Sequence, residues 1–82
     1  MTPEDIRKAF IEELVSIAPD IDPDTLEGDE HLQDDLELDS MDILNLVAAI
    51  HKRLGVSIAE EDYPRIETPD KAAAYLAQRL GA

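Results

Sequence analysis

Apolar side chains near the start of the chain recur at helical spacing, at Ile6, Phe10, Leu14 and Ile17. Thr2 and Pro3 come just before them, which is typical of an N-cap followed by proline at the first helical position. Because proline lacks the amide that continues a helix, we expect the helix to end before Pro19. The sequence therefore predicts a first helix that begins at Pro3 and ends before residue 18.

The same start signal appears again near the end of the chain. Thr68 and Pro69 repeat the cap and the proline, and Gly81 supplies a C-terminal stop. The apolar positions between them are Ala72, Ala73, Leu76 and Leu80. Residues 59–66 are predicted to hold one short turn of helix, although Pro64 interrupts it.

Residues 18–39 form a long connection rich in Asp and Pro, and loops of this length are usually either functional or disordered. Scattered apolar residues favour a loop that packs against the core: Ile21, Leu26, Leu32, Leu36 and Leu38. We expect an all-α fold, a small four-helix bundle with three main helices, one short helix and a long loop between the first and second helices. Residues 1–82 are expected to form a single domain.

The predicted second helix runs from Asp39 or Ser40 to Leu54, and Gly55 ends it. At about 100° per residue, one side is an ordinary core stripe made of Ile43, Leu46, Val47, Ile50 and Leu54. The opposite side is also mainly apolar and holds Met41, Leu44, Asn45, Ala48 and Lys52. A second apolar face indicates either another packed helix or a partner. In so small a bundle we favour the partner, and a central, doubly packed helix is the alternative.

The chain has 20 acidic and 7 basic residues, a formal net charge of −13, and no cysteine. Between residues 9 and 51 it carries no Lys or Arg. Such a charge argues against binding to nucleic acid or anionic membranes and favours partners with basic patches, although a merely solvated surface is the alternative. Without cysteine there is no disulfide and no thiolate metal site. An acidic start and the lack of a long apolar run favour a cytoplasmic protein without membrane insertion.

Ser40 stands at the predicted start of the second helix, with Asp39 before it and Asp42 two residues after it. If Asp39 is the N-cap, Ser40 is the first helical residue and its hydroxyl points to solvent, where the helix dipole favours a phosphate. The alternative is that Ser40 is itself the N-cap, and the spacing alone favours that alternative. No base for the hydroxyl is evident, since His31 and His51 lie far from it in sequence.

The segment from His31 to Asp42, HLQDDLELDSMD, resembles the signature of acyl carrier proteins, Leu-x-x-Asp-Leu-x-x-Asp-Ser-Leu at the start of a helix. The order and spacing of the predicted helices match that family over essentially the whole chain. The resemblance implies a four-helix bundle and attachment of 4′-phosphopantetheine to Ser40. It also implies that the thiol of this arm carries acyl intermediates as thioesters between enzymes of fatty-acid, lipid or polyketide-type synthesis, and that the carrier itself catalyses nothing.

The resemblance also implies partners and roles for the neighbouring residues. A separate phosphopantetheinyl transferase would use coenzyme A and Mg²⁺, and Asp39 and Asp42 would orient Ser40 or help to dock that enzyme. Acyl-transferring and synthase enzymes with basic docking patches would touch the outer helix face at Met41, Leu44, Asn45, Ala48 and Lys52. We expect the carrier to be a monomer without a bound metal ion.

Several residues depart from the pattern of the family. Glu37 stands where glycine is usual, and Met41 replaces a leucine. Asn45 and Lys52 occupy positions that are typically acidic, which indicates a specialised carrier with an altered recognition surface. The many alanines either leave an adjustable gap between helices for an acyl chain or only reflect helix propensity.

Other interpretations fit the residues less well. A Ca²⁺ loop that starts at Asp20 has Thr25 where it needs glycine and His31 where it needs a bidentate glutamate. A Ser-His-acid hydrolase would need the Gly-x-Ser-x-Gly turn, which is missing, and His31 and His51 share no ligand cluster for a metal. The remaining alternative is an unmodified acidic helical adaptor that binds a basic partner through the second helix.

Overall fold

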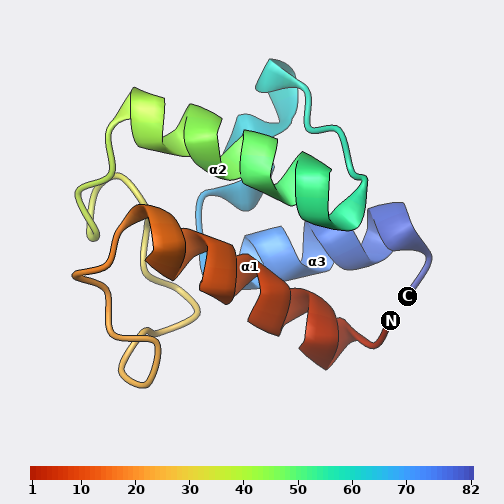
Figure 1. The fold of residues 1–82 in the computed structure, drawn as a ribbon, viewed down its shortest axis with the longest axis horizontal. Coiled ribbons are helices and arrows are strands. Elements are labelled where there is room, and N and C mark those ends of the chain that lie inside the picture. Colours follow the sequence, from red (N-terminus) through yellow and green to blue (C-terminus); the bar gives the residue numbers. More distant parts are fainter.

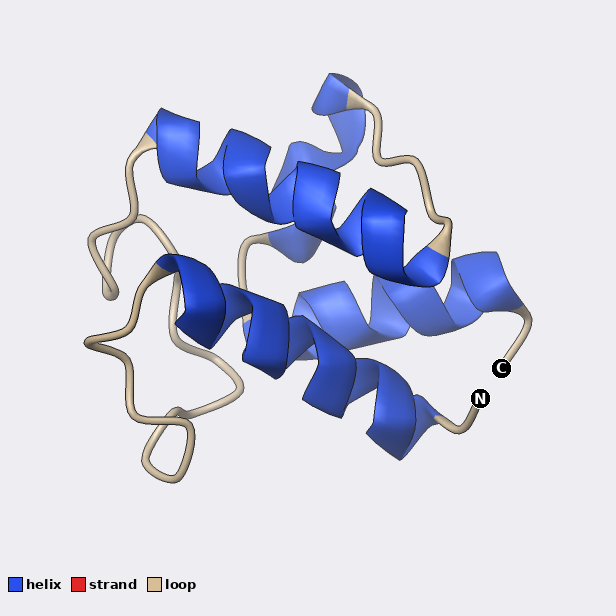
Figure 2. Ribbon diagram, viewed as in Figure 1, coloured by secondary structure: helices blue, strands red, loops and turns tan.

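The computed structural model describes residues 1–82, and all of its regular structure is helical (Figure 2). Helix α1 spans Pro3–Ile17, α2 spans Ser40–Leu54 and α3 spans Pro69–Leu80, while the short 3₁₀ helix η1 spans Glu60–Ile66. The expected all-α bundle of three main helices and one short helix, with a long loop between α1 and α2, is therefore confirmed. None of the helices has the length and apolar character that crossing a membrane requires.

Helix α1 packs against both α2 and α3, and η1 packs against α3. In Figure 1, α1 runs in the opposite direction to α2 and α3, and the two termini lie at the same end of the bundle. Because α2 has α1 on one side only, its outer side is left without a neighbouring helix. This arrangement excludes the alternative of a doubly packed second helix.

The helix boundaries follow from local capping. The hydroxyl of Thr2 accepts a hydrogen bond from the amide of Asp5 at 3.1 Å, and the hydroxyl of Thr68 accepts one from the amide of Lys71 at 3.1 Å. Each cap satisfies an amide that has no partner inside its helix. At the end of α2, Gly55 has φ of 71°, a left-handed conformation that glycine adopts at low cost. The predicted starts of α1 and α3 and the predicted end of α2 are confirmed.

The core lies where the inner faces of the three main helices meet. Its fully buried residues from these helices include Ile6, Phe10, Leu14, Leu46, Ile50 and Leu76. The long loop contributes Leu32 and Leu38, which are also buried, while its other apolar residues pack against the core in part: Ile21, Leu26 and Leu36. The prediction that this loop packs down onto the bundle is confirmed.

Hydrogen bonds hold the loop to the junction between η1 and α3. The amide of Leu32 donates to the carbonyl of Glu67 at 2.9 Å, and the amide of Asp70 donates to the carbonyl of Gly28 at 2.9 Å. The side chains of His31 and Glu67 join the same two segments, with 3.2 Å between Nε2 and Oε2. A Cβ atom at Gly28 would lie 2.2 Å from Oδ1 of Asp70, so glycine allows this close approach. The loop is therefore anchored at both Gly28 and Leu32.

Acid should weaken this anchor. Hydrogen bonds from Lys71, and then from His31, lower the pKa of Glu67. A carboxyl with a lowered pKa in the folded state stabilises the protein above its ordinary pKa, about 4.3, and loses that contribution as pH falls further. We therefore expect wild type to be more stable than Glu67→Gln at pH 6, with the gap closing below about pH 4. Urea unfolding across this pH range measures the gap, and Glu61→Gln, which makes the same change at an exposed glutamate of η1, is the matched control. A gap that stays constant down to pH 3 would contradict the prediction.

Candidate functional site

Ser40 is the first residue of α2, and it is exposed. The N-cap of the helix is Asp39, whose Oδ1 accepts a hydrogen bond from the amide of Asp42 at 2.8 Å. In return, Oδ2 of Asp42 accepts one from the amide of Asp39 at 3.2 Å, which completes a capping box. The alternative that Ser40 itself caps the helix is therefore wrong, and Ser40 makes no side-chain hydrogen bond within the chain.

The backbone amides beside this hydroxyl suit a phosphate group. The first amides of a helix have no partner in the preceding turn, and the dipole of α2 places partial positive charge at the same end. The capping box uses the amide of Asp42 and leaves those of Ser40 and Met41 free of side-chain caps. A phosphodiester on Ser40 would thus find donors beside it, so the residues present fit a phosphopantetheine group.

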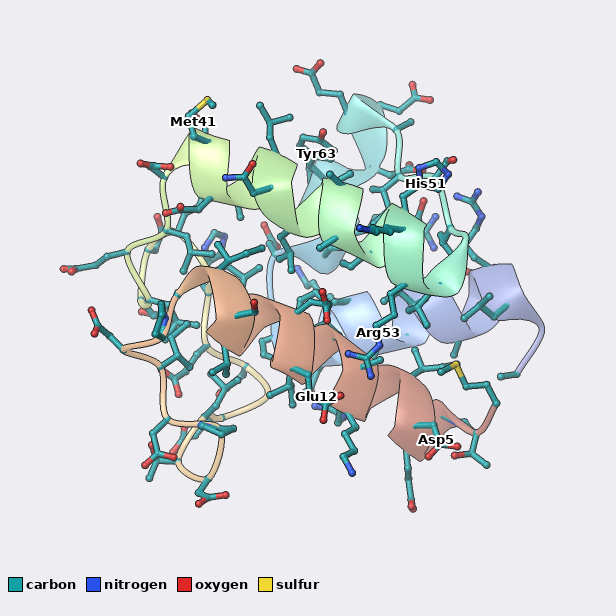
Figure 3. The ribbon with its side chains drawn as sticks, viewed as in Figure 1. Asp5, Glu12, Met41, His51, Arg53 and Tyr63 are labelled. Carbon is teal, nitrogen blue, oxygen red and sulfur yellow. The ribbon has the colours of Figure 1, made fainter.

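A groove of about 390 Å³ opens beside Ser40, between the first half of α2, η1 and the loop. Its apolar lining residues are Leu32, Ile43, Leu44, Tyr63, Pro64 and Ile66, and its other lining residues are His31, Gln33, Ser40, Glu60 and Glu67. Tyr63 lies beside α2 on η1 in Figure 3. The alanines Ala73, Ala74 and Ala77 instead line a separate groove between α1 and α3, which shares no residue with this one.

The structure brings His31 to the same groove as Ser40, although the two residues are nine positions apart in the sequence. Nδ1 of His31 accepts hydrogen bonds from the amides of Gln33 and Asp34, both at 3.2 Å. Nε2 therefore carries the ring proton and donates a hydrogen bond to Oε2 of Glu67 at 3.2 Å. With both ring nitrogens engaged, His31 has no lone pair free to take the proton of Ser40. A Ser-His-acid hydrolase is not formed, despite the presence of all three residue types in one groove.

The outer face of α2 is uncovered along its length. The side chains of Met41 and Leu44 are 62% and 47% exposed, and the other residues of this face are exposed too: Asn45, Ala48 and Lys52. In Figure 3, Met41 points away from the bundle. The remaining exposed large apolar residues, Met1 and Leu80, lie close to the chain ends. The predicted second face of the helix is thus exposed.

Glu37 has φ of 62°, a left-handed conformation that side-chain-bearing residues adopt at a cost of about 1–2 kcal/mol. Glycine is usual at this position in the family that the sequence resembles, and the backbone gives the physical reason. We expect Glu37→Gly to be more stable than Glu37→Ala by about 1 kcal/mol in urea unfolding. At Lys8, an exposed position inside α1, the order should reverse and alanine should be the more stable. Equal stability of the two Glu37 variants would contradict the prediction.

Fold and site together define a small helical domain in which the hydroxyl of Ser40 is exposed at the start of α2 and has no base hydrogen-bonded to it. A family model described as the phosphopantetheine attachment site matches residues 9–76. The chain belongs to this phosphopantetheine-binding family, that of the acyl carrier proteins.

Known relatives agree with this assignment. An acyl carrier protein from Bdellovibrio bacteriovorus is 34% identical over 59 residues, which cover 72% of this chain and 76% of that protein. One from Streptomyces coelicolor is 36% identical over 69 residues, which cover 84% of this chain and 75% of that protein. The non-reducing polyketide synthase Preu3 of Preussia isomera is 34% identical over 80 residues, 98% of this chain, but the chain spans only 3% of that protein.

The chain is thus a phosphopantetheine-carrying acyl carrier protein. It is a carrier that acts with synthase enzymes and is not itself an enzyme. Sequence reasoning did not single out Tyr63 and Glu67, which line the groove beside Ser40. The short η1 segment has too little periodicity to show which of its side chains face α2.

Proposed function

We propose that Ser40 is the residue that carries 4′-phosphopantetheine, and that residues 1–82 act as one carrier domain. The observation that supports this most directly is that Asp39, and not Ser40, caps α2. A serine used as the cap would have its oxygen tied to a helix amide. Ser40 instead keeps an exposed hydroxyl, free of hydrogen bonds within the chain, at the positive end of the helix dipole.

The carrier holds the hydroxyl of Ser40 in an accessible position, and a separate transferase activates that hydroxyl. Neither the carboxylates of Asp39 and Asp42 nor the imidazole of His31 forms a hydrogen bond with the hydroxyl of Ser40, and both nitrogens of His31 have other partners. The base that takes the proton of Ser40 therefore comes from a phosphopantetheinyl transferase that uses coenzyme A and Mg²⁺. Once attached, the arm carries acyl groups as thioesters on its thiol. The tether raises the effective concentration of the acyl group at each enzyme that the carrier visits.

Charge and exposed apolar surface govern docking in this proposal. Glu37, Asp39 and Asp42 give the Ser40 end of α2 a negative charge, which attracts Arg and Lys side chains of the transferase and of acyl-transferring enzymes. Met41 and Leu44 add apolar contact area beside the reactive hydroxyl. Such docking is fast, weak and sensitive to salt, as a carrier that serves several enzymes requires.

The groove beside Ser40 is the place that we propose for the start of the acyl chain. Its floor includes Leu32 and Ile66, each 1% exposed. Burial of one methylene stabilises by about 0.8 kcal/mol, and 1 kcal/mol raises the Tm of a small domain by about 4–8 °C. We therefore expect an octanoyl-loaded carrier to melt several degrees above the acetyl-loaded one, as followed by circular dichroism. Equal Tm values would mean that the chain stays in solvent.

The carrier function itself is tested by mass. The purified protein is incubated with coenzyme A, Mg²⁺ and a broad-specificity phosphopantetheinyl transferase, and its intact mass is measured. The expected result is the addition of one phosphopantetheinyl group per chain. If several transferases add nothing to protein that is folded by circular dichroism, the proposal fails and an unmodified adaptor becomes the better interpretation.

A further inference from the structure

The outer face of α2 carries opposite charges at its two ends. We call its residues Met41, Leu44, Asn45, Ala48 and Lys52 the docking stripe. At the Ser40 end, Glu37, Asp39 and Asp42 are negative. At the other end the last turn of α2 contains His51, Lys52 and Arg53. Between the two ends, the other residues of the stripe carry no charge: Met41, Leu44, Asn45 and Ala48.

Of the two full cations in this last turn, only Lys52 is left for a partner. Arg53 points toward α1, where its guanidinium donates to Glu12 at 2.7 Å and to Glu13 at 2.9 Å (Figure 3). These hydrogen bonds raise the pKa of Arg53, and the two carboxylates offset its positive charge. Lys52 forms no ion pair and is exposed. His51 lies at the same end of α2, on the side away from Arg53.

The two ends are far enough apart to act separately. Twelve residues of α-helix separate Ser40 from Lys52, a rise of about 18 Å. At physiological ionic strength, charges are screened over about 8 Å. A partner that lies along the docking stripe therefore meets a negative site at one end and a positive site at the other.

This inference rests on the proposed carrier function. We propose that the docking stripe selects enzymes whose contact surface carries positive charge at one end and negative charge at the other. Such a surface has Arg or Lys opposite Asp39 and Glu37, an apolar recess for Met41 and Leu44, and Asp or Glu opposite Lys52. An enzyme with a continuous basic patch is attracted at the Ser40 end and repelled at the Lys52 end. Lys52 thus favours the partners of this carrier and rejects those of a carrier that is acidic along the whole helix.

Lys52 also suits the negative end of the helix dipole, and the experiment separates this role from selectivity. The probe is a phosphopantetheinyl transferase whose docking patch is basic along its length, and the readout is kcat/KM for modification of wild type, Lys52→Glu and Lys52→Gln. Lys8→Glu is the matched control, because it makes the same change of charge at an exposed position on α1. Unfolding in urea confirms that every variant is folded under the assay conditions.

We expect Lys52→Glu to raise kcat/KM by about 3- to 10-fold, mainly through KM, with Lys52→Gln in between and Lys8→Glu changed by less than about 2-fold. The gain should vanish in 0.5 M salt. The transferase is then varied by replacing each basic residue of its docking patch with Glu, one at a time. At least one of these transferase variants should have a higher kcat/KM for wild type than for Lys52→Glu.

Each other outcome overturns the inference. Equal effects of Lys52→Glu and Lys8→Glu would mean that only net charge matters. A constant preference across all of the transferase variants would mean that no group on the enzyme faces Lys52. Modification that proceeds normally at Ser40 in these cases leaves the carrier function intact, whereas a failure of every transferase to modify any variant removes both proposals.

Discussion

Replacing Ser40 with alanine should abolish phosphopantetheinylation and leave the fold unchanged. The substitution removes the only oxygen to which the proposed phosphodiester bond is formed, so the expected loss is complete. The side chain of Ser40 is exposed and makes no hydrogen bond within the chain, and alanine is a good residue in the first turn of a helix. The free energy of unfolding should therefore change by less than about 0.5 kcal/mol. Intact mass after incubation with transferase measures the first effect, and urea unfolding measures the second.

Two other serines provide matched controls. Ser16 and Ser57 are exposed, as Ser40 is, but neither stands at the start of a helix. Ser16→Ala and Ser57→Ala should be modified at the rate of wild type, because neither hydroxyl has a helix N-terminus beside it. Addition of phosphopantetheine to Ser40→Ala, or its loss in one of the two control variants, would move the attachment site away from Ser40.

The helix boundaries could be predicted because short-range signals determine them. Thr2 and Thr68 cap α1 and α3 through amides three residues along the chain, and Gly55 ends α2 by its own conformation. None of these interactions depends on the rest of the fold. The two faces of α2 could be predicted for a similar reason, since a regular helix fixes which residues share a side.

The identity of the cap of α2 could not be read with the same ease. Asp39 and Ser40 are both good N-cap residues, so residue preference alone does not decide between them. The reciprocal hydrogen bonds of Asp39 and Asp42 decide it, because an acid three residues after the cap completes the capping box. Sequence spacing alone favoured the serine, and the family resemblance pointed to the arrangement that the structure has.

The composition of the groove beside Ser40 lay beyond prediction. The path of the long loop is set by contacts with a distant part of the chain, among them the hydrogen bond from the amide of Leu32 to the carbonyl of Glu67. Such contacts leave no periodic pattern in the sequence. As a result, nothing in the sequence predicts that His31 lies near Ser40, whereas the structure places both in one groove. The same structure shows why His31 is no catalytic base, since both of its nitrogens are engaged.

Two leucines of α2 should separate stability from recognition. Leu46 is 0% exposed on the inner face, whereas Leu44, two residues earlier, is 47% exposed on the docking stripe. Leu46→Ala leaves a cavity in the core and should cost about 3 kcal/mol, a large share of the roughly 4–12 kcal/mol expected for a domain of this size. Leu44→Ala should cost less than about 1 kcal/mol in stability. Its expected effect is on docking, where loss of a central apolar contact lowers kcat/KM for modification by about 10-fold.

The same chemical change at both positions makes each variant the control of the other. Urea unfolding and kcat/KM for phosphopantetheinylation are measured for both proteins under conditions in which each is at least nine-tenths folded. Leu46→Ala should then be modified at a rate close to that of wild type, because its outer face is intact. A normal kcat/KM for Leu44→Ala would show that the transferase does not read the docking stripe at this position. A cost below about 1 kcal/mol for Leu46→Ala would show instead that α2 contributes little to the core, since a buried leucine in a well-packed interior does not lose its side chain so cheaply.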